Sequence, residues 1–239
     1  MLQLRRVMRD GYRTAIERSP FGRHVRWRTA SPAAIALTFD DGPDPEQTPR
    51  ILDLLARHDA RATFFLIGEH VDRYPELVRR MVAEGHAVGN HTYSHSRCRE
   101  LDFPTLMRQL ERTDAALESA LGPCSSLSPL FRPPFGEIRV EQALYLAASG
   151  RTLAFWNQDS RDYRGASAQE ITALGPRLNA GDVVLLHDRF PATVEALPLL
   201  LDAIRAKGLE PVALSAAGTT EPPAETSPRP SLVRRGVVR

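Results

Sequence analysis

Short apolar segments alternate with longer amphipathic segments along most of the 239 residues. The segment 33–39 is an apolar run that ends in the acidic, Gly- and Pro-containing segment 40–45, as a buried strand does where it enters a loop. Six more apolar segments follow, and segments with a helical period separate them. The expected strands are 33–39, 62–67, 86–89, 129–132, 151–156, 182–187 and 210–214, and the expected helices are 46–58, 70–84, 104–121, 137–149, 167–179 and 191–206.

This alternation is typical of βα units, in which helices cover a parallel sheet. About seven units predict an α/β fold, a (β/α) barrel of about seven parallel strands. An open doubly wound sheet is the alternative. Because no G-x-G-x-x-G motif follows the first strand, the dinucleotide-binding form of that sheet has no support.

Composition limits the class of protein. The chain is 42% apolar and 25% charged, as globular proteins are, and it has no apolar stretch of about 20 residues that could span a membrane. Residues 1–28 lack the apolar core of a secretory signal, so we expect a cytoplasmic protein. Cys98 and Cys124 are too few for a disulfide scaffold, and we expect both to be free thiols.

The net charge of +2 is unevenly distributed. Residues 1–28 carry eight Arg and two acidic residues, and 216–239 carry four Arg and two Glu, which leaves −6 on the middle of the chain. An acidic body without a nucleic-acid-binding motif argues against nucleic acid as a partner. We expect a basic extension over 1–32, one domain over 33–215 and a disordered Pro-, Ser-, Thr- and Arg-containing tail over 216–239.

The basic extension has two interpretations. Its apolar residues can share one face of a helix with Arg on the other, as in helices that lie on a membrane surface. This interpretation predicts peripheral contact of residues 1–28 with the inner membrane face, where lipid-linked glycans would be the substrate. Gly11 weakens such a helix, and a helix that packs on the barrel is the alternative.

Polar residues follow the predicted strands, where barrels and open α/β sheets both build their sites. Asp40 and Asp41 are consecutive residues that leave a strand, so their side chains are expected to point to opposite sides. One carboxylate could then hold a metal ion while the other holds a water molecule. A solvated acidic turn is the alternative for this pair taken alone.

His91 and His95 are four residues apart, which places both imidazoles on one side of a helical turn. Both could reach one divalent ion, and neutral imidazole is a natural zinc ligand. A carboxylate from the first loop would complete three protein ligands and leave a position for water, as in catalytic zinc sites. Taken alone, a His-x-x-x-His pair is often incidental.

Three later segments carry further candidates. Arg132 offers a planar cation that can grip a carboxylate, or it is a surface residue of a rigid turn. Asp159 and Asp162 lie beside aromatic residues, in either a sugar platform or a polar loop. His187 ends a buried strand, where a carboxylate partner would keep it protonated as an acid, or it has a structural role only.

Five motifs occur in order: TFDDGP at 38–43, HTxxH at 91–95, RPPFG at 132–136, DxxDY at 159–163 and LLH at 185–187. Together they resemble the polysaccharide deacetylase family, carbohydrate esterase family 4, also called the NodB homology domain. The resemblance covers roughly residues 33–214. It implies a distorted (β/α) barrel and an enzyme that removes acetyl groups, most often N-acetyl groups, from a sugar or glycan. It also implies one divalent metal ion, usually Zn²⁺, with Co²⁺ or Mn²⁺ as alternatives.

The resemblance implies a role for each motif residue. The implied metal ligands are Asp41, His91 and His95, the implied general base is Asp40 and the implied general acid is His187. Arg132 is implied to orient Asp40, Asp162 to pair with His187, and the backbone N–H of Phe135 to bind the oxyanion. Asp159 competes with Asp162 for the pairing with His187.

The motifs depart from the family in two places. Phe135 stands where the family more often has Tyr, which leaves the main-chain donor intact. Tyr163 stands where Trp is usual, which keeps an aromatic wall and alters which sugar fits. A member of the same fold that binds glycans without catalysis is the alternative function, and the sequence does not specify the glycan.

Overall fold

The computed structural model describes residues 22–29, 31, 33–122 and 127–214. Its strands form a single sheet, and every strand pair in this sheet is parallel. The strands are β1 (Val25–Arg26), β2 (Ala34–Asp40), β3 (Thr63–Leu66), β4 (Ala87–Asn90), β5 (Leu130–Phe131), β6 (Thr152–Ala154), β7 (Gln158–Asp159), β8 (Val183–His187) and β9 (Glu210–Val212).

The order across the sheet is β1-β6-β5-β4-β3-β2-β8-β7, and β9 pairs with β2. An isolated antiparallel bridge between Arg28 and Asp182 joins the residue stretch after β1 to the start of β8, so the sheet curls back on itself. The predicted (β/α) barrel is therefore confirmed, and its closure by a bridge makes it a distorted one. All seven predicted strands are present, within two residues at each end.

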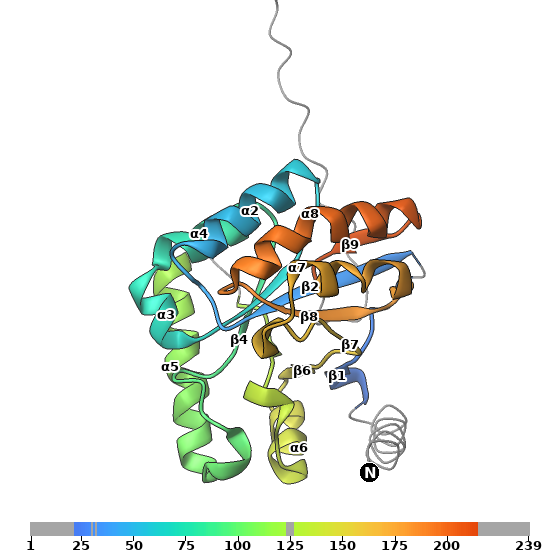
Figure 1. Ribbon diagram of the computed structural model, residues 1–239. Helices are drawn as coiled ribbons and strands as arrows, with labels where there is room; N and C mark the ends of the chain where they lie inside the picture. Colours follow the sequence, from blue (N-terminus) through green and yellow to red (C-terminus); the bar gives the residue numbers. More distant parts are fainter. Residues whose placement is uncertain (1–21, 30, 32, 123–126, 215–239) are drawn as a thin grey trace, which may run out of the picture.

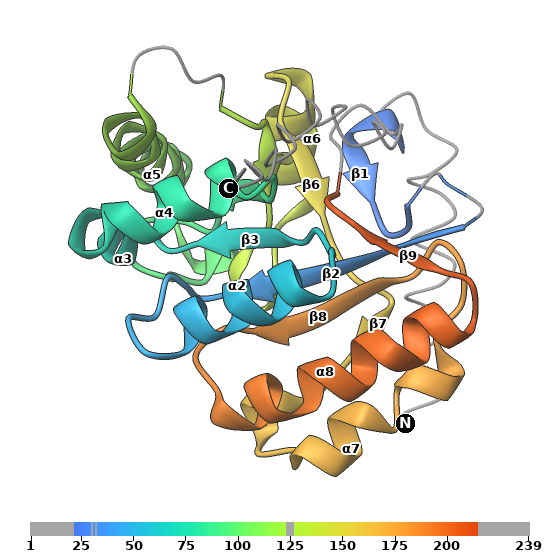
Figure 2. The same cartoon turned by 90° about the horizontal axis from the view of Figure 1, so that it is seen from above.

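The helices cover the outer side of the sheet (Figure 1). Figure 2 shows α4, α2, α8 and α7 side by side along β3, β2 and β8. The α-helices are α2 (Gln47–Arg57), α3 (Gly68–Arg73), α4 (Pro75–Ala83), α5 (Phe103–Leu121), α6 (Val140–Ala148), α7 (Ala168–Thr172) and α8 (Pro191–Ala206).

Two predicted helices are each divided into two elements, the helix predicted over 137–149 is shorter as α6, and two strands were not predicted. The helix predicted over 70–84 is α3 followed by α4, because Pro75 has no N–H to continue a helix and instead begins a new one. The helix predicted over 167–179 is α7 followed by the short 3₁₀ helix Gly175–Arg177. β1 and β7 have two residues each, as β5 does, but they contain polar residues and are only half-buried, whereas β5 is apolar and buried.

The side chains of β2 alternate between two cores. Ile35, Leu37 and Phe39 belong to the large core between the strands and the covering helices. Ala36 belongs to a second cluster inside the barrel, and Thr38 lies on that same face. Arg132 lies on this inner side as well, where its guanidinium is 4.1 Å from the centroid of the Phe65 ring and donates to Thr38.

Arg132 shows how strongly the sheet curls. It follows β5 directly, yet its guanidinium donates to Asp40 of β2 at 2.7 Å and to the carbonyl of Ala154 in β6 at 3.2 Å. β5 and β2 are three strands apart, which on a flat sheet would be about 14 Å. One side chain can make both contacts only because the inner face of the sheet is strongly concave.

The structure describes little of the predicted extension and tail. Residues 1–21 and 215–239 lie outside the described residues. Near the described N-terminal end, the 3₁₀ helix Gly22–His24 leads into β1, which pairs with β6. The sheet therefore begins before residue 33, the predicted start of the domain. Among the described helices, none has the length and apolar character needed to cross a membrane.

Cys98 is a buried free thiol, as predicted, and it packs with Leu106 and Leu146 in a small core cluster. Burial raises the pKa of this thiol to about 12, so its reactive thiolate form is rare at neutral pH. Cys124 lies outside the described residues.

Candidate metal centre and catalytic site

Asp41, His91 and His95 place one ligand atom each within 4.8 Å of one another. Asp41 Oδ1 is 3.2 Å from His95 Nε2 and 3.6 Å from His91 Nε2. This carboxylate oxygen is buried, and no hydrogen bond to it is found among the described residues. Two imidazole nitrogens around an unpartnered buried carboxylate oxygen form a donor set that fits a divalent ion such as Zn²⁺. The structure thus brings the three predicted ligands together.

The backbone that presents these ligands is not helical. His91 and His95 lie in a loop after β4, and Thr92 and His95 have left-handed φ values of 65° and 55°. The prediction that both histidines lie on a helical turn is therefore wrong. A left-handed residue cannot continue a right-handed helix, so the loop itself turns the two rings toward one point.

The expected opposite orientation of Asp40 and Asp41 is also wrong. Both carboxylates lie within 4 Å of His91 Nε2, Asp40 Oδ2 at 3.8 Å and Asp41 Oδ1 at 3.6 Å. Asp41 has a φ of 76°, so the strand geometry that separates consecutive side chains ends at Asp40. Two neighbouring carboxylates can therefore serve the same centre.

Two amide side chains that the sequence analysis missed hold the histidine loop. Asn90 Oδ1 accepts from the N–H of Thr92 at 2.9 Å, and its Nδ2 donates to the carbonyl of Leu110 in α5. Gln109 of α5 accepts at one oxygen from the N–H groups of Tyr93 and Ser94. Both contacts tie the loop to α5, and a long helix is a rigid support for a ligand loop.

The protonation states of the cluster suit metal binding. His91 Nδ1 is 2.7 Å from the carbonyl of Arg132, which can only accept, so Nδ1 carries the proton and Nε2 keeps its lone pair. Burial lowers the pKa of His95 to about 4, and a proton on His91 would add to this effect. Burial alone would raise the pKa of Asp41, but the imidazoles of His91 and His95 lower it well below its usual range. An ionised carboxylate and a neutral imidazole are the forms that bind metal.

Arg132 is fully buried, which excludes the interpretation of a surface residue in a rigid turn. Its Nη1 donates to Asp40 Oδ1 at 2.7 Å and to Thr38 Oγ1 at 2.8 Å. Its Nη2 donates to the carbonyl of Phe155 at 3.0 Å. These bonds hold one oxygen of Asp40 and leave the other, Oδ2, on the side of His91.

His187 pairs with Asp162, the first of the two partners left open by the sequence. Nδ1 of His187 is 2.7 Å from Asp162 Oδ1, and the N–H of His187 donates to Asp162 Oδ2 at 2.7 Å. Thr193 also donates to Asp162 Oδ2. Asp159 instead accepts from the hydroxyl of Tyr163 and the N–H of Arg161. Burial would lower the pKa of His187, but the hydrogen bond and charge of Asp162, together with the charges of Asp40 and Asp41, outweigh burial and raise it above its ordinary value.

Phe135 and Tyr163 are two exposed aromatic residues beside these groups. The ring of Phe135 is 49% exposed and its centroid is 4.7 Å from that of His95. The ring of Tyr163 is 41% exposed and its centroid is 5.2 Å from that of His187. Phe135 has a left-handed φ of 60°, a conformation that a bulky residue adopts only where the surroundings impose it. One ring therefore flanks the metal ligands and the other flanks His187.

Comparison with known proteins agrees with this geometry. A family model described as polysaccharide deacetylase matches residues 28–154. A peptidoglycan-N-acetylglucosamine deacetylase of Bacillus cereus is 38% identical over 189 residues, which are 76% of this chain and 67% of that protein. The chain belongs to the polysaccharide deacetylase family. It is an enzyme, a carbohydrate deacetylase.

Two more similarities support the assignment to this family. A chitooligosaccharide deacetylase of Bradyrhizobium is 36% identical over 74% of this chain and 87% of that protein. The solved structure of a peptidoglycan N-acetylglucosamine deacetylase in complex with a benzamide compound matches with a TM-score of 0.75 and 35% identity. That match covers 80% of this chain and 91% of the other. The family and the fold expected from the five motifs are confirmed.

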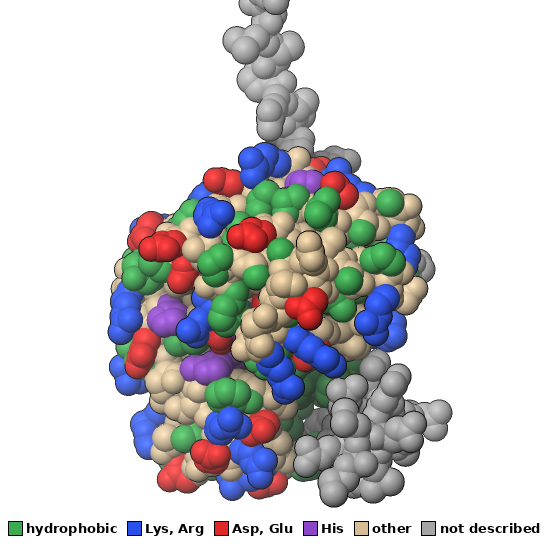
Figure 3. Space-filling model, in the orientation of Figure 1, with side chains coloured by type: hydrophobic (Ala, Val, Ile, Leu, Met, Phe, Trp, Pro, Cys, Tyr) green, Lys and Arg blue, Asp and Glu red, His purple; other side chains and the backbone are tan. Residues whose placement is uncertain are grey.

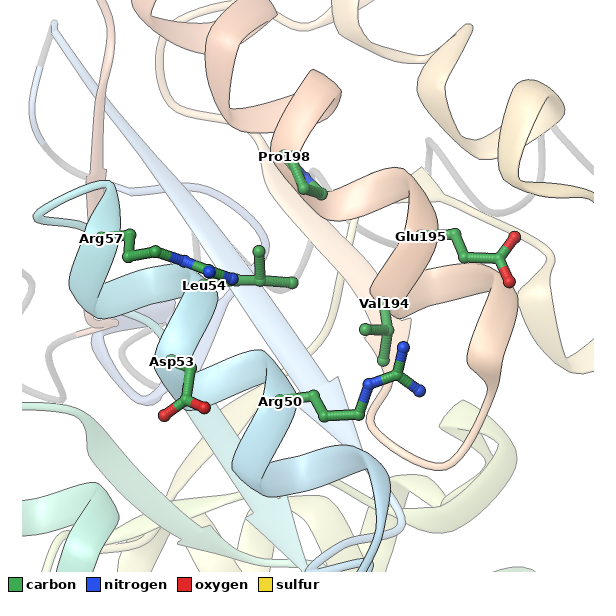
Figure 4. Close-up of a pocket in the computed structure, with 7 residues that line it drawn as sticks. All are labelled: Arg50, Asp53, Leu54, Arg57, Val194, Glu195 and Pro198. Atoms are coloured by element: carbon green, nitrogen blue, oxygen red, sulfur yellow. The ribbon is translucent and has the colours of Figure 1, made fainter.

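A surface groove between α2 and α8 lies outside this site (Figure 4). Two basic and two acidic residues line it around an apolar floor, and none of them belongs to the catalytic cluster. The lining residues are Arg50, Asp53, Leu54, Arg57, Val194, Glu195 and Pro198.

Asp188 of the deacetylase is a further site residue that the sequence analysis missed. It follows His187, is fully buried, and its Oδ2 accepts from Thr48 Oγ1 at 2.5 Å. Gly42, directly after Asp41, lies so close that a Cβ there would be 2.0 Å from Asp188 Oδ2. Asp188 therefore supports the loop that carries Asp41, and only glycine fits beside it. Burial raises the pKa of Asp188 to about 7.

We expect Asp188 to make stability pH-dependent. Because folding raises the pKa of this carboxyl, the folded protein loses stability as the pH rises from 3.8 to about 7. The variant Asp188→Asn has no carboxyl group that could ionise. The free energy of unfolding of Asp188→Asn minus that of the wild type should therefore increase from pH 3.8 to about 7, by on the order of a few kcal/mol. Denaturant unfolding with a chelator present, at acidic and at mildly alkaline pH, measures this. An equal difference at both pH values would show that folding does not raise the pKa of Asp188.

Proposed function

We propose that this deacetylase hydrolyses the N-acetyl group of a sugar in a glycan, with Asp40 as general base and His187 as general acid beside one Zn²⁺ ion. The observation that carries the proposal is the register of two strands. Asp40 of β2 and His187 of β8 are directly paired residues on neighbouring strands, so their side chains share one face. The names of the relatives, which act on peptidoglycan and on chitooligosaccharides, support an acetylated amino sugar as the substrate.

Asp40 has the geometry of a base. Arg132 occupies Oδ1, so Oδ2, on the side of His91, is the oxygen that takes a proton from the attacking water. An ion held by Asp41, His91 and His95 would supply Lewis-acid activation of that water and of the acetyl carbonyl. Arg132 fixes the direction of Asp40 without entering the reaction.

His187 has the geometry of an acid. Its Nδ1 donates to Asp162, which leaves Nε2 as the nitrogen that can deliver a proton. The raised pKa of His187 increases the fraction that is protonated near neutral pH. An amide nitrogen leaves as an amine only when it receives a proton, so a positioned acid favours N-deacetylation. Removal of O-acetyl groups stays the alternative.

Phe135 is the proposed oxyanion donor. Its left-handed backbone follows Pro134 and places its ring beside His95, one of the proposed metal ligands. We assign its N–H to the carbonyl oxygen as negative charge develops there. A donor in such a position contributes about 2.7–4 kcal/mol to lowering the barrier.

Acetate release from N-acetylated oligosaccharides tests the proposal. We expect zinc-dependent release by the wild type, and a chelator should abolish it until zinc is restored. Asp40→Asn should retain bound zinc and lose about 10²- to 10⁴-fold in kcat, because it removes the base while its amide oxygen can still accept from Arg132. Asp41→Ala should lose the zinc itself, measured by equilibrium dialysis.

Two outcomes would contradict this account. A protein that binds zinc and glycans but releases no acetate would instead fit the non-catalytic glycan-binding alternative. Full activity of Asp40→Asn would remove the proposed base. Circular dichroism of each variant checks that the fold is retained.

The pairing of His187 with Asp162 predicts a shift in pH dependence. Asp162 holds the pKa of His187 above its ordinary value, so Asp162→Asn should lower that pKa. The alkaline limb of the profile of kcat against pH, which requires protonated His187, should then move to lower pH. Asp159→Asn is the matched control, since Asp159 bonds to Tyr163 instead, and its profile should keep the wild-type limb. Equal shifts in both variants would contradict the pairing.

A further inference from the structure

Arg189 is an exposed cation beside the metal ligands that the mechanism does not use. It lies two residues after His187, its side chain is 53% exposed, and its Nη1 is 3.7 Å from Asp41 Oδ2. On the face seen in Figure 3, acidic and basic side chains are interspersed, and no large patch of one charge dominates it. Arg189 is therefore considered by its own position, as the partner of Asp41.

The proposed metal ion would compete with Arg189 for the same carboxylate. Asp41 carries one negative charge, and a divalent ion bound to it would leave little attraction for the guanidinium at 3.7 Å. Arg189 would then be a half-exposed cation next to the reaction centre without a counter-charge. A guanidinium in that position is suited to bind a carboxylate with two parallel hydrogen bonds.

A second basic group lies on the side of the site formed by Phe135. The guanidinium of Arg97 is 3.9 Å from the centroid of the Phe135 ring and is 42% exposed. Arg97 and Arg99 share one acidic partner, Glu137, at 2.9 Å and 3.9 Å. Two cations with one anion leave a net positive charge there as well. A carboxylate would gain ion-paired hydrogen bonds from such a guanidinium, whereas the hydroxyls of a neutral sugar would accept weaker ones.

We propose that Arg189 binds a carboxylate of the glycan next to the acetylated sugar, so that the enzyme prefers a carboxylate-bearing glycan to a neutral one. This inference rests on the proposed function and narrows its substrate class. Chains of peptidoglycan type carry carboxylates on the sugar and on the attached peptide, whereas chitooligosaccharides carry none. Arg189 is thus a specificity-determining residue, and Arg97 contributes to the positive potential.

The test compares Arg189→Gln with Arg57→Gln, a variant with the same loss of charge. Arg57 ends α2 at the groove shown in Figure 4, about 16 Å along the helix from the loop that carries Asp41. The substrates are a disaccharide that carries a carboxylate and its amide, which differs only in the lost charge. Arg189→Gln should lower kcat/KM for the carboxylate about 10-fold and leave the amide unchanged. Arg57→Gln should change neither.

Two further readouts do not depend on turnover. Binding of the carboxylate disaccharide to the zinc-loaded protein, measured by calorimetry, should weaken in Arg189→Gln and become less sensitive to salt. Zinc binding should tighten by up to about 5-fold, because the variant removes a cation that competes for Asp41. Binding therefore tests Arg189 even if no acetate is released, an outcome that would overturn the proposed function alone.

Three results would overturn the role of Arg189. Equal losses on the carboxylate and on the amide would indicate a general structural role. Unchanged kcat/KM and unchanged binding of the carboxylate disaccharide would show that no anion binds there. Equal effects of Arg57→Gln would show that net charge, and not position, is responsible.

Discussion

The buried guanidinium of Arg132 is the interaction on which the site depends. A buried charge costs several kcal/mol unless it is paired and its hydrogen bonds are satisfied. Arg132 meets this demand with Asp40 and Thr38 of β2 and with the carbonyls of Ala154 and Phe155. These partners come from distant strands of the sheet, so the charge is satisfied only when the sheet is curled. The same requirement fixes the direction of the proposed base.

Arg132 also connects the base to the metal centre. Its side chain holds Asp40, while its main-chain carbonyl accepts from His91 Nδ1 at 2.7 Å. A shift of Arg132 would therefore move the base and a metal ligand together. On the opposite side, Asp162 holds both the ring and the backbone of His187. Each group with a proposed role in proton transfer thus has a buried partner of opposite charge, which keeps its geometry independent of solvent.

Much of the fold follows from patterns that the sequence displays over several residues. The seven predicted strands lie in apolar segments that alternate with amphipathic helices, and buried parallel strands and their covering helices produce that pattern. β1 and β7 contain polar, half-buried residues and show no such pattern, whereas β5, which is equally short, is apolar and buried. The division between α3 and α4 could have been found from Pro75, a residue that cannot continue a helix.

The site was predictable in its residue types and not in its backbone. The five motifs contain the residues that converge. His91 and His95 were expected on a helical turn, but they lie in a loop between β4 and α5 in which Thr92 and His95 have left-handed φ values. Spacing alone does not report φ, since Thr92 carries no signal of a left-handed conformation. The choice between Asp159 and Asp162 also depended on three-dimensional contacts. Asp188 was missed because its partners, Thr48 and Gly42, are some 140 residues away in the sequence.

The central claim is that one ion binds where Asp41, His91 and His95 converge. Anomalous diffraction from crystals grown with zinc, recorded on both sides of the zinc absorption edge, tests it most directly. The account predicts one strong peak within bonding distance of Asp41 Oδ1, His91 Nε2 and His95 Nε2, with Asp40 close to the ion but not bound to it. A peak at other residues, or no peak at this cluster in zinc-saturated crystals, would contradict it.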